Sequence, residues 1–148
     1  MDGEGCFRAS IVKNTTMRFN YQIQMEFVVT QHKRDVQLLY ALKSFFGCGQ
    51  VTLAKKEENT NCCRFRVRNL ESLIKNIIPF FETHYLKTKK NIEFRRFRKL
   101  CFLLKQKEHL NEEGFAKTVF LAKAIPYTAE DEKTFENNNS IVVIRKYL

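Results

Sequence analysis

The chain has 148 residues, of which 44% are hydrophobic and 14 are phenylalanine. This composition supplies a core for one folded domain and excludes a wholly disordered chain, while 5 Gly and 2 Pro exclude a collagen-like one. No stretch approaches the roughly 20 apolar residues of a membrane helix. The first five residues, MDGEG, lack the basic and apolar segments of a secretion signal.

The charge balance points to a polyanionic partner. Lysine and arginine number 26 against 16 acidic residues, which gives a formal net charge of +10. Basic domains bind polyanions because each neutralised phosphate releases counterions. Charge alone leaves DNA, RNA, an acidic membrane surface and an acidic protein open. The 5 cysteines show no metal-ligand spacing, which favours free thiols in a reducing compartment.

Alternating polar and apolar residues predict strands at residues 6–13 and 21–30, and the short polar link between them predicts a hairpin. Two further strands are predicted at residues 49–56 and 62–68. A helix is predicted from Asp35 to Gly47, with an apolar stripe formed by Leu38, Leu39, Leu42, Phe45 and Phe46.

Three more helices are predicted after the strands. The first begins behind a cap at Asn69 and ends at Pro79, and the others cover residues 91–107 and 111–124. Residues 141–144 have the pattern of a late strand within a loosely structured tail. The element order predicts an α+β fold, a four-stranded antiparallel sheet with helices on one face. We expect one domain over residues 1–125 and a C-terminal tail over 126–148.

One face of the predicted sheet is polar and rich in arginine. If the apolar side of each strand packs on helices, the other side carries Arg8, Ser10, Gln22, Gln24, Glu26, Gln50, Thr52, Lys56, Arg64, Arg66 and Arg68. Arginine and glutamine read guanine and adenine through paired hydrogen bonds. A solvated antiparallel sheet also alternates in this way. Three adjacent arginines repel one another unless an anion lies across them, which favours nucleic-acid binding.

Five sequence blocks resemble one known family in their order and spacing. They are residues 2–7 (DGEGCF), 29–35 (VTQHKRD), 46–49 (FGCG), 77–81 (IIPFF) and 107–114 (KEHLNEEG). Together they are similar to the single-motif, organellar, intron-encoded LAGLIDADG homing endonucleases. The resemblance implies a ββαββα(α) domain and a site-specific DNA endonuclease, a phosphodiester hydrolase.

The resemblance also implies roles for individual residues. Glu4, helped by the carbonyl of Gly3, would bind Mg²⁺ or another divalent cation, which polarises the scissile phosphate. Gln31 would orient water near the metal. Lys90, or Lys89 in a register shifted by one residue, would stabilise charge on the phosphate. Without the resemblance, Glu4 reads as a turn acid, Gln31 as a solvated strand end, and the lysines as loop charges or phosphate anchors.

The first half of the family signature does not precede Asp2. The resemblance therefore implies either that the reading frame starts upstream and Met1 is internal, or that the first helix is absent. A single motif supplies one catalytic acid, so cutting both strands requires a homodimer or a partner chain that completes the motif.

A second hypothesis keeps the basic sheet without cleavage. In it the chain is an inactive RNA-binding derivative, either an intron maturase or a component of a large RNA–protein assembly such as a mitochondrial ribosome. Under both hypotheses we expect a mitochondrial location, with the chloroplast left open, and no membrane partner.

Overall fold

The structure is a computed structural model that describes residues 5–17, 19–53, 61–107 and 110–125. The elements follow in the order β1 (Gly5–Lys13), β2 (Tyr21–His32), a 3-10 turn (Lys33–Asp35), α1 (Val36–Phe46), β3 (Gln50–Thr52), β4 (Cys62–Val67), α2 (Leu70–Ser72), a π-helical segment (Leu73–Ile77), α3 (Ile78–Thr83), α4 (Lys90–Lys105) and α5 (Glu112–Ala124).

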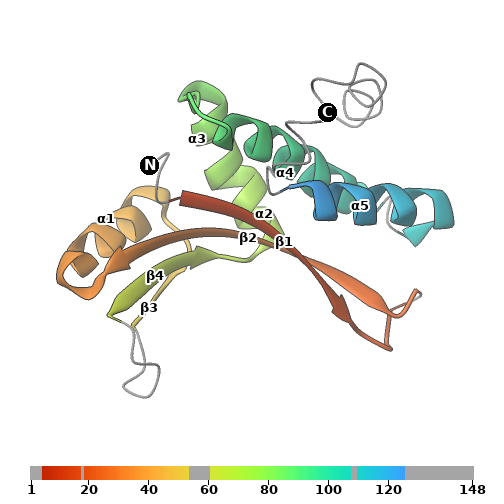
Figure 1. The fold of residues 1–148 in the computed structure, drawn as a ribbon, viewed down its shortest axis with the longest axis horizontal. Helices are drawn as coiled ribbons and strands as arrows, with labels where there is room; N and C mark the ends of the chain where they lie inside the picture. The colour runs from red at the N-terminus through yellow and green to blue at the C-terminus, as the bar shows by residue number, and fades with distance from the viewer. Residues whose placement is uncertain (1–4, 18, 54–60, 108–109, 126–148) are drawn as a thin grey trace.

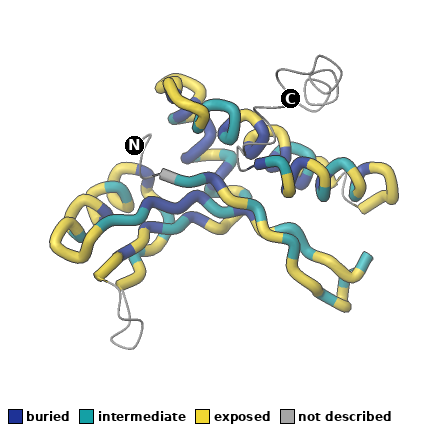
Figure 2. Tube along the Cα trace, in the orientation of Figure 1, coloured by how far each residue is buried: buried dark blue, intermediate teal, exposed yellow. Residues whose placement is uncertain are grey.

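The strands form one antiparallel sheet in the order β1-β2-β4-β3. Figure 1 shows the helices on one side of this sheet and nothing from the described residues on the other. Burial follows this division in most of β2 and β4, where Phe27, Val29, Phe65 and Val67 on the helix side are buried (Figure 2); Val28 is an exception, since it is 1% exposed although it points to the other side. The α+β fold with a four-stranded antiparallel sheet and helices on one face is therefore confirmed.

The core is an aromatic cluster between the sheet and the helices. Phe27 of β2 is 1% exposed, and its ring centroid lies 5.3 Å from that of Phe7 on β1. The Phe7 ring in turn lies 5.1 Å from that of Phe97 on α4. These positions come from the alternation along β1 and β2, which puts every second side chain on the helix side. Phe94 and Phe97 are core residues and not exposed base-stacking rings.

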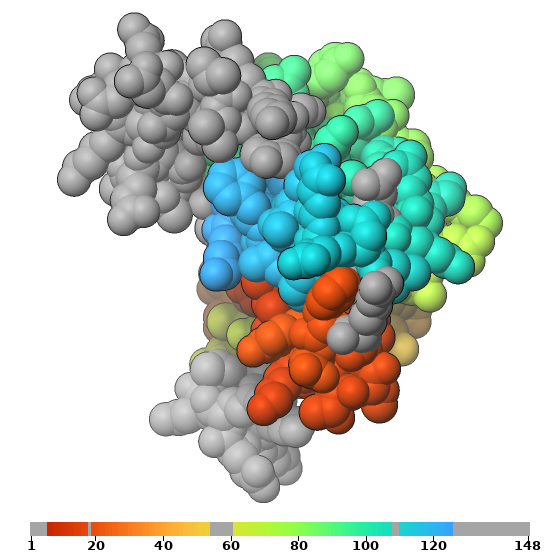
Figure 3. All heavy atoms as spheres, turned by 90° about the vertical axis from the view of Figure 1, so that its right-hand side faces the viewer, coloured from red at the N-terminus to blue at the C-terminus, as the bar shows by residue number. Residues whose placement is uncertain are grey.

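The far end of the β1–β2 hairpin is held by α5. Phe19, in the connection between the two strands, stacks on Phe115 with ring centroids 4.8 Å apart. Figure 3 views this end of the molecule and shows the hairpin directly beneath α4 and α5. The hairpin is thus anchored at its tip as well as at the core.

Fewer apolar residues of α1 are buried than the sequence predicts. Leu39 and Phe46 are buried as expected, but Leu38 is 48% and Phe45 is 67% exposed. Leu38 and Phe45 are seven residues apart, so they lie one above the other on α1, beside the buried pair Leu39 and Phe46. They therefore flank the contact between the helix and the sheet. The helix ends as predicted at Gly47, which has a left-handed φ of 68°.

The prediction that a helix ends at Pro79 is wrong. Helical backbone continues without a break from Leu70 to Thr83, and Pro79 lies inside it. A π turn precedes the proline, and the N–H of Ile78 bonds to the carbonyl of Leu73, five residues back. Proline is tolerated here because it starts a new α-helical segment, where its missing N–H costs little.

The other predicted boundaries differ only slightly from the observed ones. Asn69 caps the helix as predicted, its side chain accepting a hydrogen bond from the Ser72 N–H at 3.0 Å. The predicted strand 49–56 is described only as β3, from Gln50 to Thr52, and residues 54–60 lie outside the described residues. Residues 126–148, with the late strand predicted at 141–144, also lie outside them, so the domain boundary at 125 stays a prediction.

Alanine substitutions at Gly49 and Gly47 test how closely the chain before β3 packs on β4. A Cβ at Gly49 would lie 2.6 Å from Phe65 Cε2 and 2.9 Å from the Arg66 carbonyl oxygen, at a φ of +89°. We expect Gly49→Ala to lower the free energy of unfolding by roughly 2–3 kcal/mol, from strain and overpacking. Gly47→Ala has the same left-handed strain but meets nothing within 4 Å, so it should cost about 1 kcal/mol. Urea denaturation of both variants checks the difference, and equal losses would contradict the close approach.

Candidate nucleic-acid interface

The uncovered face of the sheet carries the predicted polar residues. Strand register sets Arg8 opposite Glu26 and Ser10 opposite Gln24 across β1 and β2. It also sets Gln50 and Thr52 of β3 opposite Arg66 and Arg64 of β4. Gln22 shares the face through the same alternation, and Arg68 follows the last residue of β4. The structure therefore brings the predicted set together, except for Lys56, which lies outside the described residues.

An internal carboxylate partly neutralises this face. Glu26 Oε1 lies 2.9 Å from Arg68 Nε, with hydrogen-bond geometry, and 3.4 Å from Arg66 Nε. The argument that the arginines need an external anion is thereby weakened, because the protein supplies one. Arginine still outnumbers glutamate on the face. No hydrogen bond or ion pair joins Arg8 or Arg64 to another described residue, so these two guanidinium groups face solvent.

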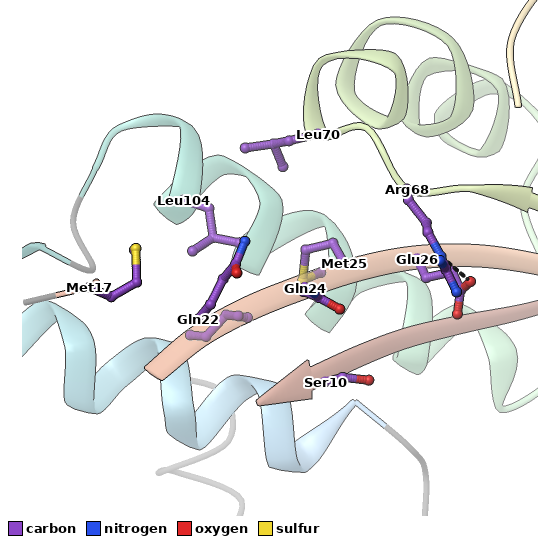
Figure 4. Close-up of a pocket in the computed structure, with 10 residues that line it drawn as sticks. Ser10, Met17, Gln22, Gln24, Met25, Glu26, Arg68, Leu70 and Leu104 are labelled. Carbon is purple, nitrogen blue, oxygen red and sulfur yellow. Dashed lines mark hydrogen bonds and ion pairs between the residues drawn. The ribbon is translucent and has the colours of Figure 1, made fainter. Parts of the chain in front are cut away.

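Two hollows interrupt the polar face. One, of about 450 Å³, lies beside the part of β2 that β4 does not pair with, and residues from both sides of the sheet and from the helical layer line it: Ser10, Met17, Gln22, Ile23, Gln24, Met25, Glu26, Arg68, Leu70 and Leu104. Figure 4 shows Glu26 and Arg68 joined by their ion pair at one end of this hollow. The other, of about 370 Å³, is lined by residues that include Gln50, Thr52, Arg66 and Arg68. The surface thus combines hydrogen-bonding side chains with hollows that a ligand could fill.

Gln31 lies near the end of β2, but not on the polar face. It pairs with Cys63, which is 1% exposed, and alternation places both on the helix side of the sheet. Gly5, the first residue of β1, pairs with Val29, two positions before Gln31, so the start of β1 and the end of β2 lie at the same end of the sheet. Gln31 is therefore near the signature segment in the strand register.

Lys90 lies in the helical layer, near the same end of the sheet. It is the first residue of α4, and its Nζ lies 3.3 Å from Glu93 Oε2. One turn later, the Phe94 ring centroid lies 5.4 Å from that of Phe7, so the start of α4 packs against the start of β1. Lys89 precedes the helix and is exposed. The start of β1, the end of β2 with Gln31 and the start of α4 with Lys90 thus lie at the same end of the sheet.

The predicted metal ligands Glu4 and Gly3 lie outside the described residues. Within the part of the chain that the structure describes, no group of three or more His, Cys, Asp or Glu side chains is arranged to hold a metal. All 5 cysteines are free, and burial raises the pKa of the Cys101 thiol well above its usual range. That thiol therefore stays protonated, and the thiols are not assembled as a ligand set.

Two residues of the polar face were missed from the sequence. Thr30 lies opposite Arg64, and His32 follows two positions later on the same side of β2. His32 accepts a hydrogen bond from the Arg34 N–H through Nδ1 at 3.2 Å, which caps the turn before α1. The alternation seen from Gln22 to Glu26 predicts both residues when it is continued to the end of the strand. Among the described helices, none has the length and apolar character needed to cross a bilayer.

Comparison with known proteins gives similar intron-encoded proteins from fungi. The chain is 32% identical over 117 residues to a probable intron-encoded endonuclease 2 of Neurospora crassa, covering 79% of this chain and 25% of that protein. It is 34% identical over 110 residues to a probable intron-encoded endonuclease Cox1-I1b of Schizosaccharomyces pombe, covering 74% of this chain and 27% of that one. The chain thus spans about a quarter of the length of these relatives.

Solved structures match over more of their length. The crystal structure of the homing endonuclease I-TnaI aligns with a TM-score of 0.77 and 37% identity, covering 97% of this chain and 91% of that one. The structure of the LAGLIDADG homing endonuclease I-SmaMI bound to cleaved DNA aligns with a TM-score of 0.78 and 27% identity, over 84% and 41% of the two chains. The sequence profile of the LAGLIDADG endonuclease family matches residues 1–101. The resemblance inferred from the five blocks is thereby confirmed, and the chain belongs to the LAGLIDADG endonuclease family.

Proposed function

We propose that this chain is a site-specific DNA endonuclease that binds its target across the uncovered face of the sheet. The observation that carries the proposal is the face itself, on which four arginines and several glutamines are gathered by strand register in a chain of this family. A curved antiparallel sheet lined in this way has the dimensions to enter the major groove. The similar structure of I-SmaMI, which is bound to cleaved DNA, supports DNA as the partner.

On this face, different side chains are suited to contact bases and phosphates. Arg64, Arg66 and Arg68 offer paired N–H donors that match guanine O6 and N7, or phosphate oxygens. Gln24 and Gln50 offer a donor and an acceptor that match adenine. Arg8, which has no partner among the described residues, is free to neutralise a phosphate.

For cleavage, the residues at the edge of the sheet would act on one phosphate. The donors assigned to the metal, the Glu4 carboxylate and the Gly3 carbonyl, are hard oxygen ligands, and these suit Mg²⁺ or a similar divalent cation. Such an ion is held by few protein ligands together with water and substrate phosphate, and when bound it supplies Lewis-acid activation. Gln31 would hold the attacking water by hydrogen bonds, and Lys90 would balance charge on the phosphate.

Cutting both strands requires a second set of these groups. One signature gives one catalytic acid per chain, so we propose a homodimer, or a complex with a chain that completes the motif. Two-fold symmetry then predicts a near-palindromic target. Sedimentation of the chain with and without duplex DNA tests this, since a monomer on DNA would contradict it.

The relatives also bear on the second hypothesis and on location. The similar proteins carry endonuclease names, and one similar structure holds cleaved DNA, so an inactive RNA-binding derivative is the less favoured function. Because relatives from several fungi are intron-encoded, we propose that this chain also is intron-encoded and acts in the mitochondrion.

Removal of one arginine tests the binding face. We expect Arg66→Ala to weaken binding to the preferred duplex by about 1–3 kcal/mol, the usual contribution of a base-reading arginine. The preferred duplex is found by selection from a randomised library, and affinity is measured by fluorescence anisotropy. Arg95→Ala is the matched control, because Arg95 is an exposed cation on α4, in the helical layer. Equal losses in the two variants would show that the sheet face is not the contact surface.

A further inference from the structure

Glu26 occupies an unusual position on the proposed DNA-binding face. Its side chain is 16% exposed, although it lies on the side of the sheet that none of the described helices covers. The same carboxylate oxygen, Oε1, lies 2.9 Å from Arg68 Nε and 3.4 Å from Arg66 Nε, so one atom pairs with two arginines. A carboxylate that faces DNA phosphates costs binding free energy. Its presence at the centre of the face therefore calls for a structural reason.

The contacts of Glu26 use the Nε atom of each arginine. The Nη1 and Nη2 donors of Arg68 can then point away from Glu26, and that pair is the one that forms a bidentate contact with guanine or phosphate. An arginine so held loses less conformational entropy on binding, because its rotamer is set before DNA arrives. Arg68 is 67% exposed and yet hydrogen-bonded, whereas Arg8 is exposed without a partner.

The two restrained arginines also shape the surface around them. Arg68 lines both hollows of the face, and Arg66 lines the one beside β3. The Nε of Arg66 is buried and makes no hydrogen bond within the described structure, so only the nearby carboxylate offsets its desolvation. Figure 4 shows Arg68 reaching from the end of β4 to Glu26 across the end of the larger hollow. A change at Glu26 would release both side chains at once.

We propose that Glu26 is a positioning residue that sets the sequence specificity of this face by holding Arg66 and Arg68, without itself reading a base. This inference rests on the proposed DNA binding and deepens it. The carboxylate has two effects of opposite sign. It improves contacts with the correct bases through pre-organisation, and it weakens contacts with phosphates through its charge. Both effects raise the ratio of specific to non-specific affinity.

The test compares Glu26→Gln with wild type on two duplexes. One is the duplex that wild type selects from a randomised library, and the other is a scrambled duplex of equal length and composition. We expect affinity for the scrambled duplex to rise and the ratio of specific to non-specific affinity to fall by roughly 10-fold, the scale of one base-reading pair. Glu112→Gln is the matched control, because it removes one exposed carboxylate from α5, away from the face. It should leave the ratio unchanged.

Specificity profiles separate positioning from direct reading. If Glu26 positions the arginines, Glu26→Gln relaxes the same base pairs that Arg66→Ala and Arg68→Ala relax. In the double variant Arg66→Ala/Arg68→Ala it causes no further loss of base preference, although removal of its charge still raises affinity for any duplex. Relaxation confined to a different base pair, with cytosine as the preferred base, would mean that Glu26 accepts a hydrogen bond from cytosine and would overturn the proposal. Equal rises in both affinities would also overturn it, since charge alone would then explain the effect.

A measurement without DNA distinguishes this inference from the proposed function. Relaxation of ¹⁵N at the arginine Nε atoms should show Arg68 ordered in wild type and as mobile as Arg8 in Glu26→Gln. An Arg68 that is mobile in wild type would overturn the proposal even if the chain binds its site. If Arg68 is ordered but the chain selects no duplex, the proposed function fails. The role of Glu26 in specificity then fails too, although Glu26 does restrain Arg68.

Discussion

Replacing Glu4 by glutamine should abolish cleavage and leave DNA binding nearly intact. The glutamine keeps the shape of the side chain but loses the negative charge, which is the main attraction between this site and a divalent cation. Loss of metal activation removes several kcal/mol of transition-state stabilisation, so we expect a fall in cleavage rate of roughly 10³-fold or more. The contact surface on the sheet is unchanged, and affinity for the selected duplex should therefore stay close to that of wild type.

Single-turnover cleavage of the selected duplex in Mg²⁺, with affinity measured in Ca²⁺, separates these two effects. Glu112→Gln serves as the control, since it removes an exposed carboxylate from the first turn of α5. If Glu4→Gln cleaved at the wild-type rate, Glu4 would not bind the catalytic metal. A large loss of affinity would show that Glu4 supports the fold or the DNA contact instead.

The largest loss of stability is expected for Phe27→Ala. The Phe27 ring lies at the centre of the aromatic cluster, with centroid distances of 5.3 Å to Phe7 and 5.5 Å to Phe81. It also lies edge-on to Phe46, at 6.2 Å. Its removal opens a cavity that touches the sheet and two helices, and such substitutions cost about 3–5 kcal/mol. Guanidinium denaturation followed by circular dichroism measures this change.

Phe45→Ala is the control for the same residue type. Phe45 is 67% exposed, and its ring packs edge-on against those of Phe46 and Phe80. We expect it to cost roughly 1 kcal/mol or less, as for most substitutions at the surface. Similar losses for the two variants would contradict the assignment of Phe27 to the centre of the core.

The strands of this protein could be predicted because alternation is a local property. Each polar–apolar alternation in β1, β2 and β4 places one side of the strand toward the core, and the structure follows it except at Val28, which is buried on the opposite side. The cap at Asn69 was equally predictable, since a side chain three residues from its target decides it. Both signals are complete within a few residues of sequence.

Pro79 and Phe45 show where local signals fail. The usual rule ends a helix at proline, but packing of Ile77, Ile78 and Phe81 against the sheet keeps the helix going through a π turn. Phe45 belongs to an apolar stripe by spacing, yet it is 67% exposed, because the side of α1 that packs on the sheet is centred on Leu39 and Phe46. Tertiary contacts decided both outcomes, and a single sequence does not reveal them.

The functional face was predictable as a set, but not in its internal contacts. Strand parity is sufficient to gather Arg8, Arg66 and Gln24 on one side. The ion pairs of Glu26 with Arg66 and Arg68 join residues about forty positions apart, and they depend on the register between β2 and β4. Register follows from long-range pairing, so the restraint on these arginines appears only in the folded structure.

Divalent-dependent cleavage tests the central claim most directly. The purified chain is incubated with plasmid DNA that carries the uninterrupted form of the host gene, without the intron that encodes the chain, in Mg²⁺ and in Mg²⁺ with excess EDTA. The account predicts one double-strand cut at a single position, present with Mg²⁺ and absent with EDTA. Intact plasmid under both conditions, from a folded chain that still binds duplex DNA with a steep salt dependence, would contradict an endonuclease and leave a binding protein in its place.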